Sequence, residues 1–253
     1  MRIPFLAAVA FLSVPSWAQQ PISRVVTTVV KPDRVADFEA AVKQYNEVYS
    51  KITGARARAM FQSMTGPNRF RRAISYEKWG DLDRGPGAEA FIGNAELARI
   101  NARIQSCVQS STTEIEVLLP DLSLPRPSDA PKLVVVSRSR IRPDKIAEYT
   151  AIVKDELMPA LKKGGAKSFA VRRVRFGAPT NEFYTSMRVD NWAEAGGTNV
   201  ARAAMGEEAY QRVVAKLTAL TLVREQDVFR YRGDLSYAPA SGGASTSSTA
   251  TQR

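Results

Sequence analysis

The stretch Val30–Phe38 reads Val-Lys-Pro-Asp-Arg-Val-Ala-Asp-Phe, and Ile141–Tyr149 repeats its pattern as Ile-Arg-Pro-Asp-Lys-Ile-Ala-Glu-Tyr. Two more pieces recur in the same order: Asn68-Arg69-Phe70 as Asn181-Glu182-Phe183, and Asp121-Leu122-Ser123 as Asp234-Leu235-Ser236. The offset is 111 residues for the first match and 113 for the other two, which implies a two-residue insertion between them. Because solenoid repeats are only about 20–50 residues long, this period predicts one domain duplicated in tandem.

Each half has the hydrophobic pattern of strand, helix, strand, strand, helix, strand. In the first half, β-branched and alternating residues predict strands over 22–30, 59–64, 70–76 and 112–119. Apolar residues three or four apart predict helices over 33–52 and 88–107. The second half predicts strands over 133–141, 168–176, 183–189 and 222–232, and helices over 144–163 and 199–219. Pro159 is expected to kink the first of those helices.

This order is the ferredoxin-like β-α-β-β-α-β arrangement. Such a unit forms a four-stranded antiparallel sheet with both helices on one face, so its other face needs a partner. A second unit in the same chain provides that partner at high effective concentration. We therefore expect an α+β fold, in which two ferredoxin-like βαββαβ repeats (22–123 and 133–236) pack as an intramolecular α+β barrel.

The segments outside the two halves have their own signatures. Residues 1–18 have a charged start, a short apolar run and small residues at Ser16 and Ala18, as in a secretory signal peptide. The apolar run is shorter than the roughly 20 residues that span a bilayer, and no later segment is apolar enough to do so. We expect a periplasmic or secreted protein after cleavage near Ala18, with a Pro-rich linker at 124–132 and a disordered Ser/Thr/Gly-rich tail at 237–253.

Composition removes several classes of function. The chain of 253 residues has no histidine and one cysteine, Cys107, which falls in a helical pattern and is expected to be buried and inert. Without histidine there is no Ser-His-Asp or Cys-His arrangement and no usual ligand for transition metals or haem. We therefore expect no cofactor and no metal, and lean against an enzyme. The net charge of +11 permits anionic partners, but export and the lack of a nucleic-acid motif argue against nucleic acid.

A resemblance rests on several of these residues. The chain resembles the dimeric α+β barrel superfamily, in particular its antibiotic-biosynthesis-monooxygenase-like and NIPSNAP-like branches, as a fused tandem duplication. The residues that carry it are Lys31-Pro32-Asp33, Arg142-Pro143-Asp144, the run 157–167, Phe176-Gly177 with Asn181-Glu182-Phe183, and Trp79 and Trp192. The resemblance implies a barrel with an internal cavity, on a fold that hosts unrelated activities. Haem-using relatives need a proximal histidine, which this chain lacks.

Arginines on two predicted strands are the main candidates for a ligand site. Arg138 and Arg140, with Arg142, share one strand face, as do Arg173 and Arg175 on the next strand, whereas Arg172 points the other way. With Tyr184, these four arginines (Arg138, Arg140, Arg173 and Arg175) could bind an anionic ligand, because guanidinium groups match carboxylate and phosphate geometry. The alternative, which we favour, is structural pairing with acids such as Glu225 and Asp227.

Other duplicated residues have a simple structural interpretation. Trp79 and Trp192 are expected to anchor helix to sheet, with a stacking wall for an aromatic ligand as the alternative. Asn68 and Asn181 are expected to form turns, because Asn tolerates left-handed backbone. Gly85-Pro86-Gly87 and Gly196-Gly197 indicate loops at helix entries and no phosphate cradle.

Three functions stay open from the sequence. The first is a barrel that binds a small apolar or anionic ligand in the cavity between the repeats. The second is a cofactor-independent monooxygenase or isomerase of the antibiotic-biosynthesis-monooxygenase type. The third is a protein-interaction module, in which exposed sheet edges could also form a homo-oligomer.

Overall fold

The computed structural model describes residues 21–52, 54–83, 94–196 and 200–239. The predicted signal peptide, most of the predicted tail and the Gly85-Pro86-Gly87 loop lie outside these residues. The described strands are β1 Ile22–Val30, β2 Ala59–Ser63, β3 Arg69–Tyr76, β4 Val108–Leu118, β5 Leu133–Ile141, β6 Ala170–Phe176, β7 Glu182–Val189 and β8 Thr221–Tyr231. The helices are α1 Val35–Tyr49, α3 Ala95–Cys107, α4 Ile146–Ile152, α5 Met158–Lys163, α6 Trp192–Gly196, α7 Val200–Met205 and α8 Glu207–Leu220.

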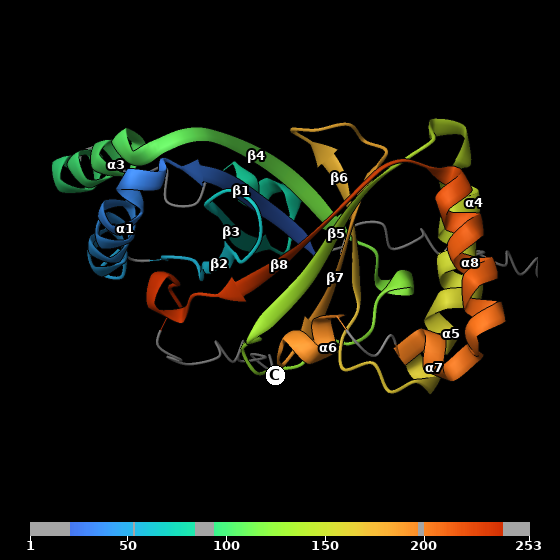
Figure 1. The fold of residues 1–253 in the computed structure, drawn as a ribbon. Coiled ribbons are helices and arrows are strands. Elements are labelled where there is room, and N and C mark those ends of the chain that lie inside the picture. The colour runs from blue at the N-terminus through green and yellow to red at the C-terminus, as the bar shows by residue number, and fades with distance from the viewer. Residues whose placement is uncertain (1–20, 53, 84–93, 197–199, 240–253) are drawn as a thin grey trace, which may run out of the picture.

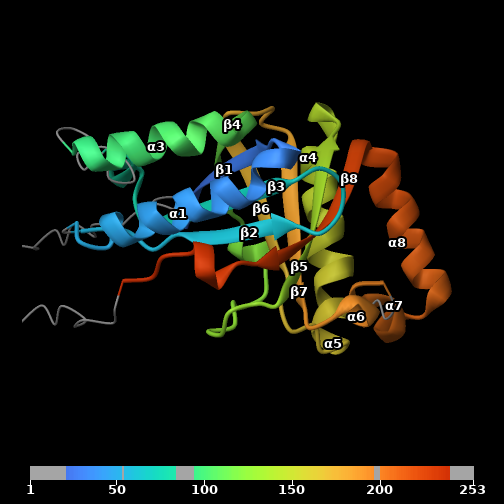
Figure 2. The ribbon, with the colours of Figure 1, turned by 60° about the vertical axis from the view of Figure 1, so that its left-hand side comes forward.

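The strands close into one antiparallel barrel in the order β1-β3-β2-β8-β5-β7-β6-β4. Within it, β4-β1-β3-β2 come from the first half and β8-β5-β7-β6 from the second, and the halves meet where β2 pairs with β8 and β6 with β4. Helices α1 and α3 lie outside the barrel on one side, and α4, α5 and α8 lie on the opposite side (Figure 1). Figure 2 shows the same division after a turn of the molecule. The predicted α+β barrel is thereby confirmed.

The helices of the second half are more broken than the sequence pattern predicted. A π-helical stretch, Val153–Leu157, separates α4 from α5 just before Pro159. Proline cannot donate the helical hydrogen bond and its ring crowds the preceding turn, so the distortion predicted at Pro159 takes this form. Gly206, at a φ of 85°, ends α7 and starts α8, which divides the single helix predicted over 199–219.

Glycine makes the two hairpin turns that connect β2 to β3 and β6 to β7. Gly66 and Gly177 adopt positive φ, and among the described residues no other residue type does. Asn68 and Asn181 lie in these turns, as expected, but neither has left-handed backbone, because the preceding glycines take that conformation at no steric cost. The backbone carbonyls of Asn68 and Asn181 instead accept hydrogen bonds from the N–H groups of Val30 and Ile141.

Gly177 is also required by close packing where the two halves meet. A Cβ at this position would lie 2.0 Å from the backbone oxygen of Thr113 on β4. The absence of a side chain thus lets the end of β6 lie against β4.

The Asp-Leu-Ser sequences join each half to the other. Ser123 Oγ accepts from the N–H of Val171 on β6, and Ser236 Oγ accepts from the N–H of Met60 on β2, both at 2.9 Å. Leu122 is buried in the second half and Leu235 in the first. We call these two connections clasps: the first clasp is Asp121–Ser123 and the second clasp is Asp234–Ser236.

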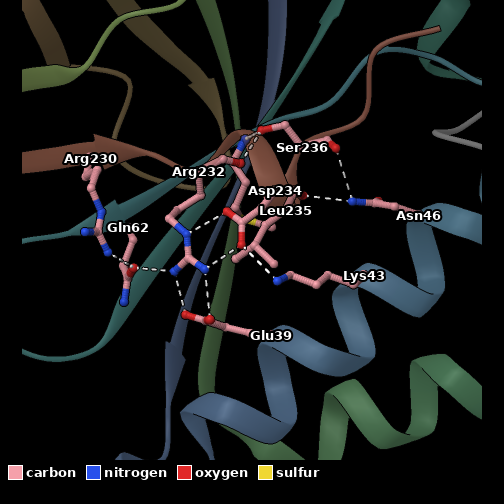
Figure 3. Close-up of polar contacts among 10 residues, drawn as sticks. Glu39, Lys43, Asn46, Gln62, Arg230, Arg232, Asp234, Leu235 and Ser236 are labelled. Atoms are coloured by element: carbon pink, nitrogen blue, oxygen red, sulfur yellow. Dashed lines mark hydrogen bonds and ion pairs between the residues drawn. The ribbon is translucent and has the colours of Figure 1, made fainter.

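The second clasp has a larger polar network (Figure 3). Arg232 donates to Glu39 of α1 at 2.6 and 2.8 Å, to Asp234 and to Gln62. These hydrogen bonds, to Asp234 first, raise the pKa of Arg232 and hold the pKa of Asp234 well below its usual range. The end of β8 is thus tied to α1 of the other half.

Three further expectations are settled by the described residues. Cys107 is buried as a free thiol, as predicted. Trp79 and Trp192 are 42% and 50% exposed, so they are not core anchors. Trp79 instead contacts the exposed ring of Phe176 edge-on at 5.9 Å. In the described part of the chain, no helix combines the length and apolarity needed to cross a membrane.

Candidate functional site

The interior of the barrel contains a cavity of about 740 Å³. Side chains alternate across a strand, so every second residue of each strand faces this space. Its lining comes from both halves, with Ala73 and Ser75 of β3 and Ser186 of β7 among the small residues that leave it open. A cavity of this size lies in the usual range for small-molecule sites, about 300–1,000 Å³.

One part of the wall is apolar. Val25 and Phe61 contribute from β1 and β2, and Val134, Val136 and Phe229 from β5 and β8. Val134 lies opposite Phe229 in the β5–β8 pairing, so these two side chains are neighbours on the inner face. This part can pack against an apolar ligand body.

Another part of the wall is cationic. Arg71 of β3 forms an ion pair with Glu116 of β4 at 2.7 Å, and Arg172 of β6 lies 4.0 Å from the same carboxylate. Glu116 is 2% exposed, and burial raises its pKa although Arg71 and Arg172 oppose the shift. Burial also lowers the pKa of the Arg172 guanidinium. One buried carboxylate therefore pairs with two partly buried arginines.

Two more arginines extend this cationic wall toward the connector between the halves. Arg188 of β7 donates to the backbone oxygen of Asp129 at 2.6 Å and lies 3.5 Å from its carboxylate. Arg126 lies in the connector and lines the same cavity. With Arg56, which lies 3.7 Å from Asp81, the lining holds five arginines, and Glu116 is the one acidic residue among the lining residues. Even with Asp81 and Asp129 counted as partners of Arg56 and Arg188, positive charge exceeds negative charge around the cavity.

The residues predicted as a linker form part of the cavity wall. Pro125, Arg126 and Pro131 line it, together with Ser123 and Leu124 on either side of the predicted boundary. The segment is attached to β6, because the N–H of Leu124 donates to the carbonyl of Phe169 at 2.7 Å. The connector therefore contributes to the site in addition to joining the halves.

Tyr184 is the one sequence-predicted site residue that lines the cavity. Its ring lies under the guanidinium of Arg71, with 4.5 Å between the guanidinium carbon and the ring centroid. Burial raises the pKa of Tyr184 well above its usual value, so the phenol stays protonated and can donate a hydrogen bond.

The other four predicted residues lie elsewhere. Arg138 and Arg140 face the barrel interior beyond the cavity, where both donate twice to Glu182 at 2.6–2.9 Å. Arg138 also lies 3.8 Å from Glu225. Arg173 lies on the outer face, donates to the carbonyl of Thr180 and stacks over Phe183. Arg175 lies on the same outer face of β6 as Arg173, opposite to Arg172, and does not line the cavity.

Sequence reasoning missed Arg71, Arg126, Arg172, Arg188 and Glu116. The available signal was the alternation of β7, where Tyr184, Ser186 and Arg188 share a face, and of β6, where Arg172 takes the face opposite to Arg173. Among the described residues, no group of three acidic or cysteine side chains is placed to hold a metal ion.

Comparison with known proteins bears on the fold. No family model and no curated protein matches the chain. A solved structure of a proposed monooxygenase from Fusobacterium nucleatum subsp. nucleatum is similar with a TM-score of 0.57 and 12% identity, over 84% of this chain and 93% of that one. One from Lactobacillus acidophilus has a TM-score of 0.57 and 6% identity, over 84% and 94%. An anthrone oxidase-like protein has a TM-score of 0.58 and 10% identity, over 85% and 92%. At such identities the likeness shows a shared α+β barrel fold.

Proposed function

We propose that this protein binds a small molecule with an apolar body and an acidic group in the barrel cavity. The observation that carries the proposal is the lining itself, which combines an apolar wall with five arginines, two of which share the carboxylate of Glu116. A guanidinium group binds a carboxylate, sulfonate or phosphate through paired hydrogen bonds. Binding is expected to be stronger than at the surface because Arg71 and Arg172 are partly desolvated.

Within this proposal, Arg172 and Arg188 bind the acidic group and Tyr184 donates a hydrogen bond to it. Arg138 and Arg140 act one step away by fixing Glu182, and Arg173 and Arg175 support β6 from the outer face. The connector residue Arg126 completes the charged wall on the side where the chain passes between the halves.

The test uses two fluorescent probes of similar shape. The first, 8-anilinonaphthalene-1-sulfonate, is an aromatic anion, and the second, N-phenyl-1-naphthylamine, lacks the charge. We expect saturable binding of the anion and about tenfold weaker binding by Arg172→Met, which corresponds to roughly 1.4 kcal/mol. The matched control is Arg212→Met, because Arg212 lies on the outer surface of α8 and is 63% exposed.

A cavity-filling variant, Val136→Trp, should abolish binding of both probes. Equal affinity of Arg172→Met and the unchanged protein for the anion would contradict the charged site. Equal affinity for both probes in the unchanged protein would leave only an apolar cavity and would also contradict the proposal.

A second candidate is a cofactor-independent monooxygenase or isomerase, as the sequence resemblance suggested. It is favoured by Glu114 and Glu116, which share the inner face of β4, and by a buried oxygen of Glu114 that has no hydrogen-bond partner among the described residues. A buried carboxylate beside a phenol could remove a proton from an acidic C–H group. Oxygen uptake with the anthrone dithranol, lost in Glu114→Gln and Glu116→Gln but kept in Arg212→Met, would support it; no uptake would exclude this reaction for this substrate.

We also propose that the two halves are ferredoxin-like repeats from a tandem duplication, in a barrel nearest to the antibiotic-biosynthesis-monooxygenase-like and NIPSNAP-like branches. The support is that each half provides four adjacent strands in matching order, β4-β1-β3-β2 and β8-β5-β7-β6. The sequence matches at offsets of 111 and 113 residues fall at matching places in the two halves.

Export remains part of the proposal. A mature protein that starts at Gln19 in the periplasm or medium, measured as intact mass, would support it, and a retained Met1 would contradict it. A homo-oligomer through sheet edges is also proposed, because β4 pairs with β6 only from Ile115 onward and β8 pairs with β2 only over Phe229–Tyr231. Light scattering of the purified protein would test it.

A further inference from the structure

The layer between the first-half helices and the outer face of the barrel contains three arginines. Arg24 of β1 lies opposite Ile74 of β3, and Arg72 of β3 lies opposite Met60 of β2. Arg58 immediately precedes β2 and alternates onto the same outer face as Met60. The three guanidinium groups therefore come from neighbouring strands beneath α1, on the other side of the sheet from the barrel cavity.

Two aromatic residues of α1 pack against Arg58. The guanidinium of Arg58 lies 3.5 Å from the ring centroid of Tyr49 and 4.5 Å from that of Tyr45, both on α1. Arg58 is 4% exposed, and its Nη2 donates to the side-chain oxygen of Asn46 at 3.1 Å. Tyr76 of β3 is 2% exposed on the same outer face.

Several polar atoms in this layer lack a partner. Arg58 Nε, Arg72 Nε and the Tyr76 hydroxyl are buried and have no hydrogen bond within the described part of the chain. No ion pair joins Arg24, Arg58 or Arg72 to a described carboxylate. This layer therefore has more positive than negative charge, and leaving buried charged groups unpaired is destabilising.

The second half shows that the fold does not require these charges. At the same offsets it has Val135, Phe169 and Thr185 in place of Arg24, Arg58 and Arg72. The backbone confirms one of these matches, because Tyr237 N–H donates to the carbonyl of Arg58 as Leu124 N–H donates to that of Phe169. A layer of uncharged residues builds the same architecture, so the fold alone does not account for the arginines.

The protonation states fit an anion site. Burial first, and then the neighbouring Arg58, lower the pKa of Arg72 to about 10, so the group stays charged at neutral pH. Burial raises the pKa of Tyr45 and Tyr76, which keeps their hydroxyls as donors. The layer therefore contains positive charge and, at Arg58 Nε, Arg72 Nε and the Tyr76 hydroxyl, buried donors without an acceptor among the described residues.

We propose that Arg24, Arg58 and Arg72, with the Tyr76 hydroxyl, bind a phosphate-class oxyanion between α1 and the outer face of the β1–β3–β2 sheet. The guanidinium groups supply charge and paired donors to the tetrahedral oxygens. This site lies outside the barrel cavity and does not depend on the proposed ligand there.

The experiment measures the thermal unfolding midpoint of the full chain with inorganic phosphate, at ionic strength matched with sodium chloride. We expect phosphate at about 100 times its Kd to raise the midpoint on the order of 5–10 °C. The variants Arg58→Phe and Arg72→Thr, which introduce the second-half residues, should lose this shift. Phenyl phosphate, tested alongside, distinguishes a free phosphate site from one that accepts a phosphate ester.

Two control variants distinguish phosphate binding in this layer from phosphate binding in the barrel cavity. Arg172→Met removes a barrel-cavity arginine and should keep the phosphate shift, so failure of the cavity proposal and failure of this one are distinguishable. Arg72→Lys keeps the charge without the paired donors and should weaken the response even if Arg72→Thr does not fold.

Three outcomes would overturn the proposal. The first is no phosphate shift in the unchanged protein. The second is an undiminished shift in Arg72→Lys and Arg58→Phe. The third is loss of the shift in Arg172→Met, which would assign the phosphate to the barrel cavity.

Discussion

The two layers between helices and barrel are built differently. In the second half, α4, α5 and α8 cover one continuous apolar cluster that includes Ile152, Leu161 and Phe183. In the first half, the buried apolar residues form separate clusters around α1 and α3, with Arg58 and its tyrosines among them. This contrast indicates that only part of each layer is needed to set the fold. The residues in the rest of the layer can therefore differ between the two halves.

The shared part is an aromatic pair next to the start of the first helix of each half. Phe38 and Phe70 have ring centroids 4.8 Å apart at 45°, and Tyr149 and Phe183 have centroids 5.0 Å apart at 50°. Phe70 and Phe183 are both essentially buried. These pairs are also where the sequence match between the halves is strongest.

The largest expected effect comes from removing these rings one at a time. Phe70→Ala and Phe183→Ala should each cost about 3–5 kcal/mol of unfolding free energy, because each leaves a cavity in a buried cluster. Urea unfolding measures both values. A cost below about 1 kcal/mol for either variant would contradict this comparison, because that ring would then contribute little to the stability of the layer between its helices and the barrel.

A comparable loss of unfolding free energy is expected inside the barrel, where the second half, and not the first, holds the arginine cluster. There the second half holds Arg138 and Arg140 on Glu182, which is 1% exposed, while the first half has Thr27, Val29 and Arg69 at the matching offsets. Glu182→Gln should cost about 2–3 kcal/mol, because it removes the buried counter-charge of two partly exposed guanidinium groups, of which only Arg138 has a second carboxylate nearby among the described residues, Glu225.

The control for that change replaces the whole cluster. Arg138→Met, Arg140→Met and Glu182→Leu together should recover most of the loss in urea unfolding, because no unpaired charge is left. A triple variant as unstable as Glu182→Gln would show that the cluster contributes packing or specificity in addition to charge balance.

The two clasps give a smaller and more symmetric prediction. Ser123→Ala and Ser236→Ala each remove the oxygen that accepts a backbone N–H from the other half, and each should cost about 1–3 kcal/mol. Thermal and urea unfolding check both variants. In 1 M salt the two losses in unfolding free energy should stay similar, because both lost hydrogen bonds join uncharged groups. A much smaller loss for Ser236→Ala than for Ser123→Ala would mean that the Arg232 network, and not the Ser236 hydrogen bond, stabilises the second clasp.

The smallest effect is a pH dependence at the cavity wall. Burial raises the pKa of Glu116 above its ordinary value of 4.5. The folded state therefore holds the proton more tightly, and the stability from this group is present below the ordinary pKa and is lost as pH rises through the folded value. Glu116→Gln resembles the protonated form, so its unfolding free energy should improve relative to the unchanged protein as pH rises above about 4.5. Urea unfolding from pH 3.5 to 8 measures this difference, and a fall with pH would contradict it.

Much of the architecture could be predicted from residues alone. The repeated Pro-Asp turns and the hydrophobic periods predicted the order of the elements, and two half-bare sheets in one chain predicted a closed barrel. The break at Gly206 and the π-helical stretch before Pro159 were underestimated, because a period of apolar residues continues across a local backbone distortion. Exposed Trp79 and Trp192 were misplaced, since size and duplication do not reveal whether a helix covers them.

The candidate site was harder to predict. The alternation of side chains along a strand placed Arg172 on the opposite face from Arg173 and Arg175. Alternation alone does not show which face points into the barrel, so the sequence could not decide between the two sets. Tyr184 lines the cavity, and its role as a ligand contact stays a prediction. Arg126 was not considered because a Pro-rich segment has no periodicity from which a direction can be inferred.

By itself, the sequence determined the order of most strands and helices, because backbone propensity and hydrophobic period are local properties. Only the tertiary structure decided which strand faces enclose the cavity, that each Asp-Leu-Ser clasp fastens the opposite half, and that arginines from distant strands meet beneath α1. Those contacts depend on how strands from the two halves pair around a closed ring, and no local preference encodes that geometry.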